Sequence, residues 1–505
     1  MKKLLFITLI YLFNGFIIRA QNMTDAIRVA DTQVNGTARF TAMGGAFGAL
    51  GGDMAAVAIN PASSAVFNTS FAVGTLGLTN RTIGTSYFTN KENTVTNPFN
   101  FNQIGVVIAA ENDNTKWERF SFAINYNRDN SLREEFLLRG INTNASVIDY
   151  FKNIADDANI PLSLVRAQTG ETLDDLYQYL GENESYDAQQ VFLGYNGYIL
   201  DPLDSTNDNN TVYNPSDNYM SSEQQMQLTN SGFNDKFTIN MATSYDKKTF
   251  FGVSLQILSY KFKQKSNFIE KGVGATFLKE IKFTNSLTTK GEGAALSLGI
   301  IHRITDGIRV GLTYDSPKIY TITDELSQSL ETVRDDGGNL IRQTVDPTTV
   351  NVYPEYTLTI PSKTTASVAL VLGKKGLLSA DYSYQNQANI KMKPTNDFLQ
   401  ANDDIKQNLK AVSEFKLGAE WRLGQLSLRG GYTLKQTPYK NTAIRGDYTS
   451  YSTGLGYHFG DVTIDLAYVM SKYNDSHQLY TTGLTNAALL VRDNKQVLVT
   501  AKFEL

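Results

Sequence analysis

The chain of 505 residues contains no cysteine. Disulfide scaffolds, thiolate metal sites, cysteine nucleophiles and a lipid-bearing N-terminal cysteine are therefore excluded. The chain also lacks an internal run of about 20 apolar residues, so no membrane-spanning helix is expected. A transmembrane β-barrel is still compatible with the negative mean hydropathy, because barrel strands bury only alternate residues in lipid.

Positive charge is not in excess: 46 Lys and Arg stand against 50 Asp and Glu, which gives a formal net charge of −4. Nucleic-acid binding requires a basic face, so we do not expect this class of partner. The first residues are an exception, because Lys2 and Lys3 precede the apolar segment Leu4–Ile18 and then Ala20. This pattern predicts a signal peptide over residues 1–20.

Short alternating strands with tight turns dominate the rest of the chain. In 462–470, Val, Ile, Leu, Tyr and Met share one face, while Thr, Asp, Ala and Val share the other. Short turns alternate with long loops, as in outer-membrane barrels. We therefore predict an all-β fold, a transmembrane antiparallel barrel over residues 70–505. The pattern indicates fourteen strands between 70–88 and 490–505, although twelve or sixteen also fit.

One predicted external loop, residues 131–233, is long and acidic. Residues 145–158 and 172–180 within it have helical spacing, and Val147, Phe151 and Ile154 fall on one side of the first segment. One interpretation is a solvated surface excursion, acidic for solubility. The other is a folded cap whose apolar helix faces build the rim of a ligand site.

The segment Asn35–Phe67 is rich in Gly and Ala and nearly free of charge. We expect residues 21–69 to form a hatch that plugs the barrel lumen. Gly44 and Gly45 allow positive φ in a compact backbone, and Pro61 restricts Asn60 to extended or turn conformations.

These four residues, with the flanking charges Arg39 and Asp53, are the candidate gate residues. They either pack the plug or shift when ligand binds. For Arg39 and Asp53 we expect an ion pair to the barrel wall more than contact with a substrate carboxylate. No ligand-binding residue can be assigned.

Catalytic, metal and cofactor sites are not expected. The three histidines, His302, His458 and His477, map to different turns and loops, and no Ser-His-Asp set or pair of catalytic carboxylates stands out. The glycines at 45, 48 and 51 follow no strand and precede no Gly-Lys-Ser, which disfavours nucleotide binding. An alternative left open is Ca²⁺ on the acidic run 201–210.

The motif Arg39-Phe-Thr-Ala-Met-Gly-Gly-Ala46, followed by Asn60-Pro61-Ala62, resembles the N-terminal hatch of the FadL/TodX family, and the loops place it closer to a Bacteroidetes-type branch. Later strand motifs in 311–317, 417–422, 428–432 and 454–468 follow the family's order over nearly all of the mature chain. The resemblance implies a fourteen-stranded outer-membrane barrel with a hatch in its lumen. It also implies passive uptake of long-chain fatty acids or other hydrophobic compounds, with exit sideways through the wall. The long acidic loop departs from the best-known members.

Two functions therefore compete. The first is transport, with a hydrophobic small molecule or fatty acid, outer-membrane lipid and other outer-membrane proteins as potential partners. The alternative is a non-transporting scaffold subunit of an outer-membrane secretion or assembly complex. A water-filled porin is disfavoured because the hatch would obstruct its channel.

Overall fold

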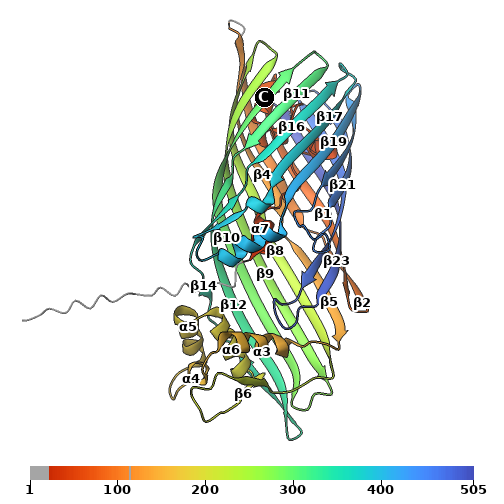
Figure 1. Cartoon of the computed structure of the whole chain (residues 1–505). Helices are drawn as coiled ribbons and strands as arrows, with labels where there is room; N and C mark the ends of the chain where they lie inside the picture. The colour runs from red at the N-terminus through yellow and green to blue at the C-terminus, as the bar shows by residue number, and fades with distance from the viewer. Residues whose placement is uncertain (1–21, 113–114) are drawn as a thin grey trace, which may run out of the picture.

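The computed structural model describes residues 22–112 and 115–505. The predicted signal peptide, residues 1–20, lies outside the described residues. The described chain forms a closed antiparallel β-barrel of fourteen strands, drawn upright in Figure 1, with a helical cap at its lower end and the C-terminus at its upper end.

The barrel strands follow one another round the wall in chain order. Two of them are each built from two segments, β11 with β12 and β15 with β16. The bounds are β1 Phe71–Tyr87, β3 Phe99–Glu111, β4 Trp117–Ser131, β8 Ser221–Tyr245, β9 Thr249–Val273, β10 Leu278–Arg303, β11 Ile308–Asp315, β12 Lys318–Asp336, β15 Tyr356–Ile360, β16 Lys363–Val371, β17 Gly376–Asn386, β19 Ala411–Leu423, β20 Leu426–Lys435, β21 Tyr448–His458, β22 Val462–Gln478 and β23 Ala487–Glu504.

The last strand closes the barrel onto the first. β23 pairs with β1 from Phe71↔Glu504 to Ser86↔Leu489. The prediction of fourteen strands is therefore confirmed, and the counts of twelve and sixteen are wrong.

The remaining elements lie inside the barrel or beyond its wall. The N-terminal segment contributes α1 Met23–Ala30, α2 Ala38–Ala42, and the 3₁₀ helices η1 Ala55–Ala58 and η2 Pro61–Val66. The other elements are β2 Asn90–Thr96, β5 Glu134–Asn142, α3 Val147–Ala158, α4 Leu162–Val165, α5 Leu173–Asn183, α6 Tyr186–Asn196, β6 Leu200–Pro202, β7 Tyr213–Pro215, β13 Asn339–Val345, β14 Asn351–Val352, η3 Gln387–Asn389, β18 Lys391–Lys393 and α7 Leu399–Asn408.

The predicted loop 131–233 contains more strand than expected. β5 occupies 134–142 and pairs with β8, which begins at Ser221 rather than near 234. The segment outside the barrel sheet is therefore 143–220, and it holds α3 to α6. We call residues 143–220 the cap.

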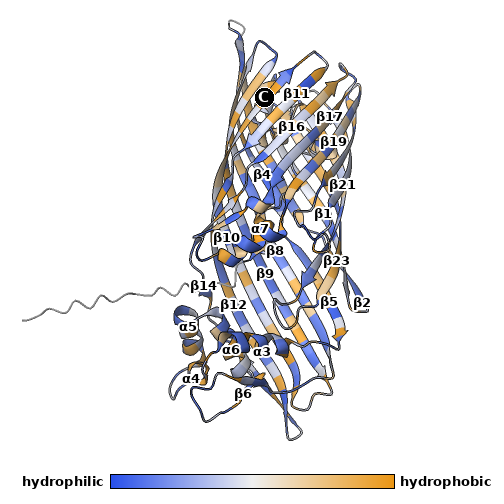
Figure 2. Cartoon of the chain, viewed as in Figure 1, coloured by the Kyte–Doolittle hydropathy of each residue, from blue (hydrophilic) through white to orange (hydrophobic). Residues whose placement is uncertain are grey.

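Outward-facing positions of the wall form an apolar band. On β9, Val253, Leu255 and Ile257 are exposed, while Ser254 and Gln256 between them are buried toward the lumen. Exposed aromatic residues edge the band on one side at Trp117, Tyr245, Phe251, Trp421, Tyr457 and Phe459, and on the other at Phe99, Phe101, Phe237, Tyr382, Phe415 and Tyr451. In Figure 2 apolar residues are frequent along the upper part of the strands, whereas the lower extensions are mostly hydrophilic.

No helix among the described residues is long and apolar enough to cross a membrane.

Candidate functional site

The N-terminal segment that lies in the lumen has a compact backbone made of short helices and glycine turns. Thr37 caps α2 by accepting a hydrogen bond from the Phe40 N–H at 3.0 Å. Gly44 and Gly45 follow the helix at φ +62° and +72°, values that only glycine adopts without strain. A Cβ at Gly44 would also lie 3.0 Å from the backbone N and O of Tyr432 on β20. The backbone therefore turns directly against the wall.

The wall meets this segment with glycines of its own. A Cβ on any of them would lie within 3.0 Å of a hatch atom, so the hatch and the wall touch at the level of the backbone. These wall glycines, which we call the glycine belt, are Gly252, Gly299, Gly311, Gly418, Gly431 and Gly454. Side chains there would displace the hatch, since cores are too densely packed to absorb added volume freely.

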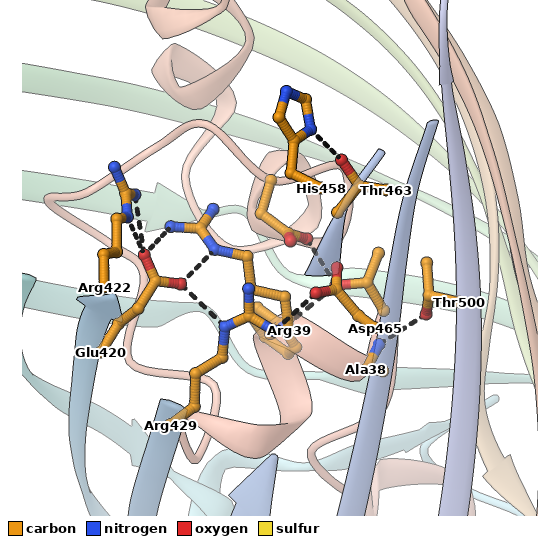
Figure 3. Close-up of polar contacts among 12 residues, drawn as sticks. Ala38, Arg39, Glu420, Arg422, Arg429, His458, Thr463, Asp465 and Thr500 are labelled. Carbon is orange, nitrogen blue, oxygen red and sulfur yellow. Dashed lines mark hydrogen bonds and ion pairs between the residues drawn. The ribbon is translucent and has the colours of Figure 1, made fainter. Parts of the chain in front are cut away.

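Arg39 joins the hatch to the wall through a charge cluster centred on the buried Glu420 (Figure 3). Its Nε donates to Glu420 Oε2 on β19 at 2.7 Å, and its Nη1 donates to the Gly52 carbonyl at 2.9 Å. Arg429 also donates to Glu420 at 2.8 Å and to Asp465 at 2.6 Å, and Arg422 completes the set. The ion pair expected between Arg39 and the wall is present.

Asp53 does not behave as expected. Its carboxylate accepts hydrogen bonds from the Thr37 hydroxyl at 2.8 Å and the Ala55 N–H at 2.9 Å, both within the hatch. It forms no ion pair within the described part of the chain. The prediction of an ion pair from Asp53 to the wall is therefore wrong, because the carboxylate closes an internal turn instead.

Asn60 and Pro61 lie against the other side of the wall. Asn60 is extended, at φ −132° and ψ 112°, and its amide donates to the Gly48 carbonyl at 2.7 Å and to the Ile300 carbonyl on β10 at 3.1 Å. Pro61 then begins η2, directly over Gly252 and Gly299. All six candidate residues thus belong to the hatch, and Arg39 and Asn60 bond it to the wall.

Sequence reasoning missed the wall residues that hold the hatch. Asp381 on β17 accepts the N–H groups of Phe47 and Gly48, both at 3.0 Å. Glu420 accepts a hydrogen bond from Arg39. The Ser64 hydroxyl lies 2.8 Å from the hydroxyl of Ser121 on β4. The available signal was a charged residue among the lumen-facing positions of a strand, as Asp381 between Ser379 and Ser383 on β17.

Comparison with known proteins identifies solved structures that share this architecture. No protein-family model and no curated protein sequence matches the chain. Among solved structures it is similar to a Pseudomonas aeruginosa FadL homologue, with a TM-score of 0.53, 10% identity, and coverage of 94% of this chain and 99% of that one. It is also similar to the P. putida toluene transporter TodX, with a TM-score of 0.50, 12% identity, and coverage of 94% and 99%. The chain has the fold of FadL-type barrels.

This FadL-type barrel carries an apolar groove of about 600 Å³ on the outer face of its wall. The groove crosses β4, β8, β9, β10 and β11. Its lining is Phe120, Met241, Ala242, Thr243, Phe251, Gly252, Val253, Leu298, Gly299, Ile300, Leu312 and Tyr314. Gly252 and Gly299 are cross-strand partners, so only backbone separates the groove from Asn60 and Pro61.

The cap is fixed to the other end of the barrel by the carboxylate of Glu270. This side chain, fully buried on β9, accepts from the Val147 N–H at 3.0 Å, the Gln224 amide at 2.8 Å and the Ser146 hydroxyl. Burial raises the pKa of Glu270 to about 7, although the three donors oppose the shift. The wall therefore caps helix α3 with a carboxylate that titrates near neutrality.

The three histidines and the acidic run 201–210, which the sequence analysis considered, do not form a catalytic or metal site. His302 bonds to Thr249, His458 bonds to Thr463, and His477 packs against Phe136, so the three histidines do not converge. In the acidic run, Asp208 pairs with Arg166, and Asp204 accepts from Thr206. Within residues 22–112 and 115–505, no group of three or more His, Asp or Glu could hold a metal ion.

Proposed function

We propose that this chain is an outer-membrane transporter that passes hydrophobic compounds, such as long-chain fatty acids, through a barrel gated by its hatch. The observation that carries this proposal is the fit of the hatch inside the wall. It contacts strands around the circumference, from Ser121 on β4 to Thr500 on β23, and the glycine belt brings it to backbone distance. A hydrophilic solute therefore has no straight path through the lumen past the hatch.

Residence in the outer membrane is supported by the apolar band and its aromatic edges. Transmembrane barrels carry an outward apolar band flanked by aromatic girdles, with alternation along every strand. The two similar structures are a FadL homologue and a toluene transporter, which supports hydrophobic substrates for this chain as well.

We further propose that ligand leaves sideways at the groove behind Asn60 and Pro61. The groove faces the bilayer, its lining is apolar, and the wall is one backbone thick at Gly252 and Gly299. The ladder between β9 and β10 continues past these glycines. Exit therefore requires a transient opening of the ladder, which movement of Pro61 away from the glycines would permit.

Uptake into cells tests the transport function. A bacterial host without its own outer-membrane fatty-acid transporter should take up labelled palmitate, and separately toluene, only when this chain is present. Uptake of a trisaccharide, which requires an open pore, should stay at background. Equal background uptake of both hydrophobic compounds, with partner proteins recovered in stoichiometric amounts, would instead support the scaffold hypothesis.

The exit is tested by filling the groove. Val253→Trp places a large side chain in it, while Leu466→Trp makes the same change on the opposite wall, at a residue equally exposed (43% and 44%). We expect Val253→Trp to lower the uptake rate by about tenfold and Leu466→Trp to leave it unchanged. Equal rates in both variants would exclude the groove as the exit.

A further inference from the structure

Three arginines lie on the side of the hatch that faces the short turns of the barrel, which is the end that also holds the C-terminus. Arg303 on β10 and Arg309 on β11 are direct cross-strand partners, and both face the lumen. Arg119 on β4 is close enough to repel Arg303 electrostatically. Like charges placed directly opposite each other destabilise a sheet, so this arrangement costs the barrel stability unless an anion offsets it.

Among the described residues, Asp306 attracts Arg303 only from a distance, and two of the three arginines lack a direct carboxylate partner. Arg119 pairs with Glu111 at 3.0 Å. Arg303 and Arg309 form no ion pair within the described residues, and Asp246 and Asp306 in the adjoining turns are exposed. The Nε atoms of Arg303 and Arg309 are buried, and neither has a hydrogen-bond partner in the part of the chain that the structure describes. A buried donor left unpaired loses the free energy of its hydration, which makes it a strong attachment point for an acceptor.

The guanidinium groups are nevertheless held in place. Arg303 stacks over Phe250 at 4.8 Å and donates to the Lys247 carbonyl at 3.3 Å. Arg309 donates to the Leu50 carbonyl of the hatch at 2.9 Å, and Arg119 to the Ala65 carbonyl at 3.4 Å. Fixed guanidinium forks match carboxylate and phosphate oxygens in a bidentate manner. The cluster is thus preorganised for an oxyanion next to the hatch.

We infer that Arg119, Arg303 and Arg309 form a binding site for the carboxylate or phosphate head group of an amphiphile at this mouth of the barrel. Such a head group could belong to a fatty acid or to a membrane phospholipid. Because Arg309 and Arg119 hold the hatch carbonyls of Leu50 and Ala65, a bound anion would compete for the same guanidinium hydrogens. The site stands whether or not the chain transports ligands.

Binding to the purified full-length barrel in nonionic detergent tests this inference. The probes are laurate, dodecyl phosphate, dodecanol and inorganic phosphate, each measured by calorimetric titration. We expect laurate and dodecyl phosphate to bind at least tenfold more tightly than dodecanol. Tighter binding of laurate would point to a fatty acid and tighter binding of dodecyl phosphate to a phospholipid. Binding of inorganic phosphate as tightly as dodecyl phosphate would overturn the amphiphile assignment.

The variant Arg303→Gln with Arg309→Gln should weaken binding of both anionic probes at least tenfold. Its matched control is Arg139→Gln, an exposed arginine on β5 that bonds only to Gln225. The double variant should melt at the same temperature as the parent or higher, because it removes a like-charge pair. Unchanged anion affinity in the double variant, or dodecanol binding as tightly as laurate, would overturn the inference. Neither result would bear on uptake, which tests the transport proposal separately.

Discussion

The hatch and the cap are held to the barrel wall in different ways. The hatch meets wall glycines backbone to backbone, and its larger side chains, such as Phe40, Phe47 and Leu50, pack mainly on one another. The cap instead buries large side chains, among them Tyr150, Phe151, Tyr177 and Phe192, together with residues of the wall.

This difference bears on which element moves. Apolar burial contributes about 25 cal/mol per Å². The aromatic side chains of the cap pack on residues of the wall and so anchor it strongly, whereas the larger side chains of the hatch mostly bury one another. The hatch is held by shape and by separate polar contacts around the wall, among them Arg39 to Glu420 and Asn60 to Ile300. Such contacts can be exchanged one by one. The proposed gating movement therefore falls to the hatch, while the cap stays anchored to the wall through a shared core.

The largest expected effect comes from giving the glycine belt a side chain. In Gly431→Val, the new Cβ would meet the Gly44 nitrogen and the Met43 carbonyl carbon. We expect the hatch to be expelled and ion conductance across a planar bilayer to rise by an order of magnitude or more. The matched control is the adjacent Gly430→Val, since only Ser452 O, at 4.0 Å, lies near its Cβ. High conductance in the control, or a closed Gly431→Val barrel, would refute the backbone fit.

Removing the central carboxylate of the charge cluster ranks next. Glu420→Gln leaves Arg39, Arg422 and Arg429 facing a neutral amide, and breaking a buried pair in this way costs about 3–5 kcal/mol. Arg39→Gln should cost less, about 1.5–3 kcal/mol, because Glu420 keeps two other arginines. Hydrogen exchange of the Ala38–Ala42 amides measures both. A larger effect of Arg39→Gln than of Glu420→Gln would contradict the assignment of Glu420 as the centre.

The cap should respond to a cavity without involving the hatch. Phe151→Ala removes a fully buried ring and is expected to cost about 3–5 kcal/mol. Hydrogen exchange should accelerate in α3 and α6 and stay unchanged in α2. The control Tyr179→Ala changes an exposed residue of the cap and should leave exchange unchanged in all three helices. Acceleration in α2 would show that the two regions are one cooperative unit.

The smallest expected effect concerns pH. The Glu270 pKa of about 7 exceeds its ordinary value of 4.5, so between these values the barrel binds more protons with its cap docked than with its cap released. Docking is therefore strongest below pH 4.5 and weakens as pH rises through 7, by at most about 3.5 kcal/mol. Protection of the α3 amides should fall from pH 5 to 8 beyond the intrinsic exchange trend, and Glu270→Gln should remove that change. A parent protein with pH-independent protection would contradict the prediction.

The wall was predictable because its alternation is local. Residues 462–470 became β22 as expected, and the closure of β23 on β1 followed from the even count of strands. The outer part of β8, residues 221–233, was assigned to a loop. It lies beyond the apolar band, where polar side chains such as Gln225 and Gln227 face outward and the pattern fades.

The hatch itself was predictable, but its partners in the wall were not. Positive φ at Gly44 and Gly45, and the extended Asn60, follow from local chemistry. The partners Asp381 and Glu420 are more than 300 residues distant in the chain, and no local pattern connects them. The role of the wall glycines was equally hidden, because a glycine in a strand does not reveal what approaches it.

The most direct test is a reversible disulfide between hatch and wall in this cysteine-free chain. Ser64→Cys with Ser121→Cys would join η2 to β4, where the hydroxyls lie 2.8 Å apart. Thr365→Cys with Ser383→Cys, also 2.8 Å apart, would join two wall strands only. We predict that oxidation stops palmitate uptake in the first pair, that reduction restores it, and that the second pair transports in both states. Full palmitate uptake by the first variant in its oxidised state would contradict the claim that the hatch moves at η2 during transport.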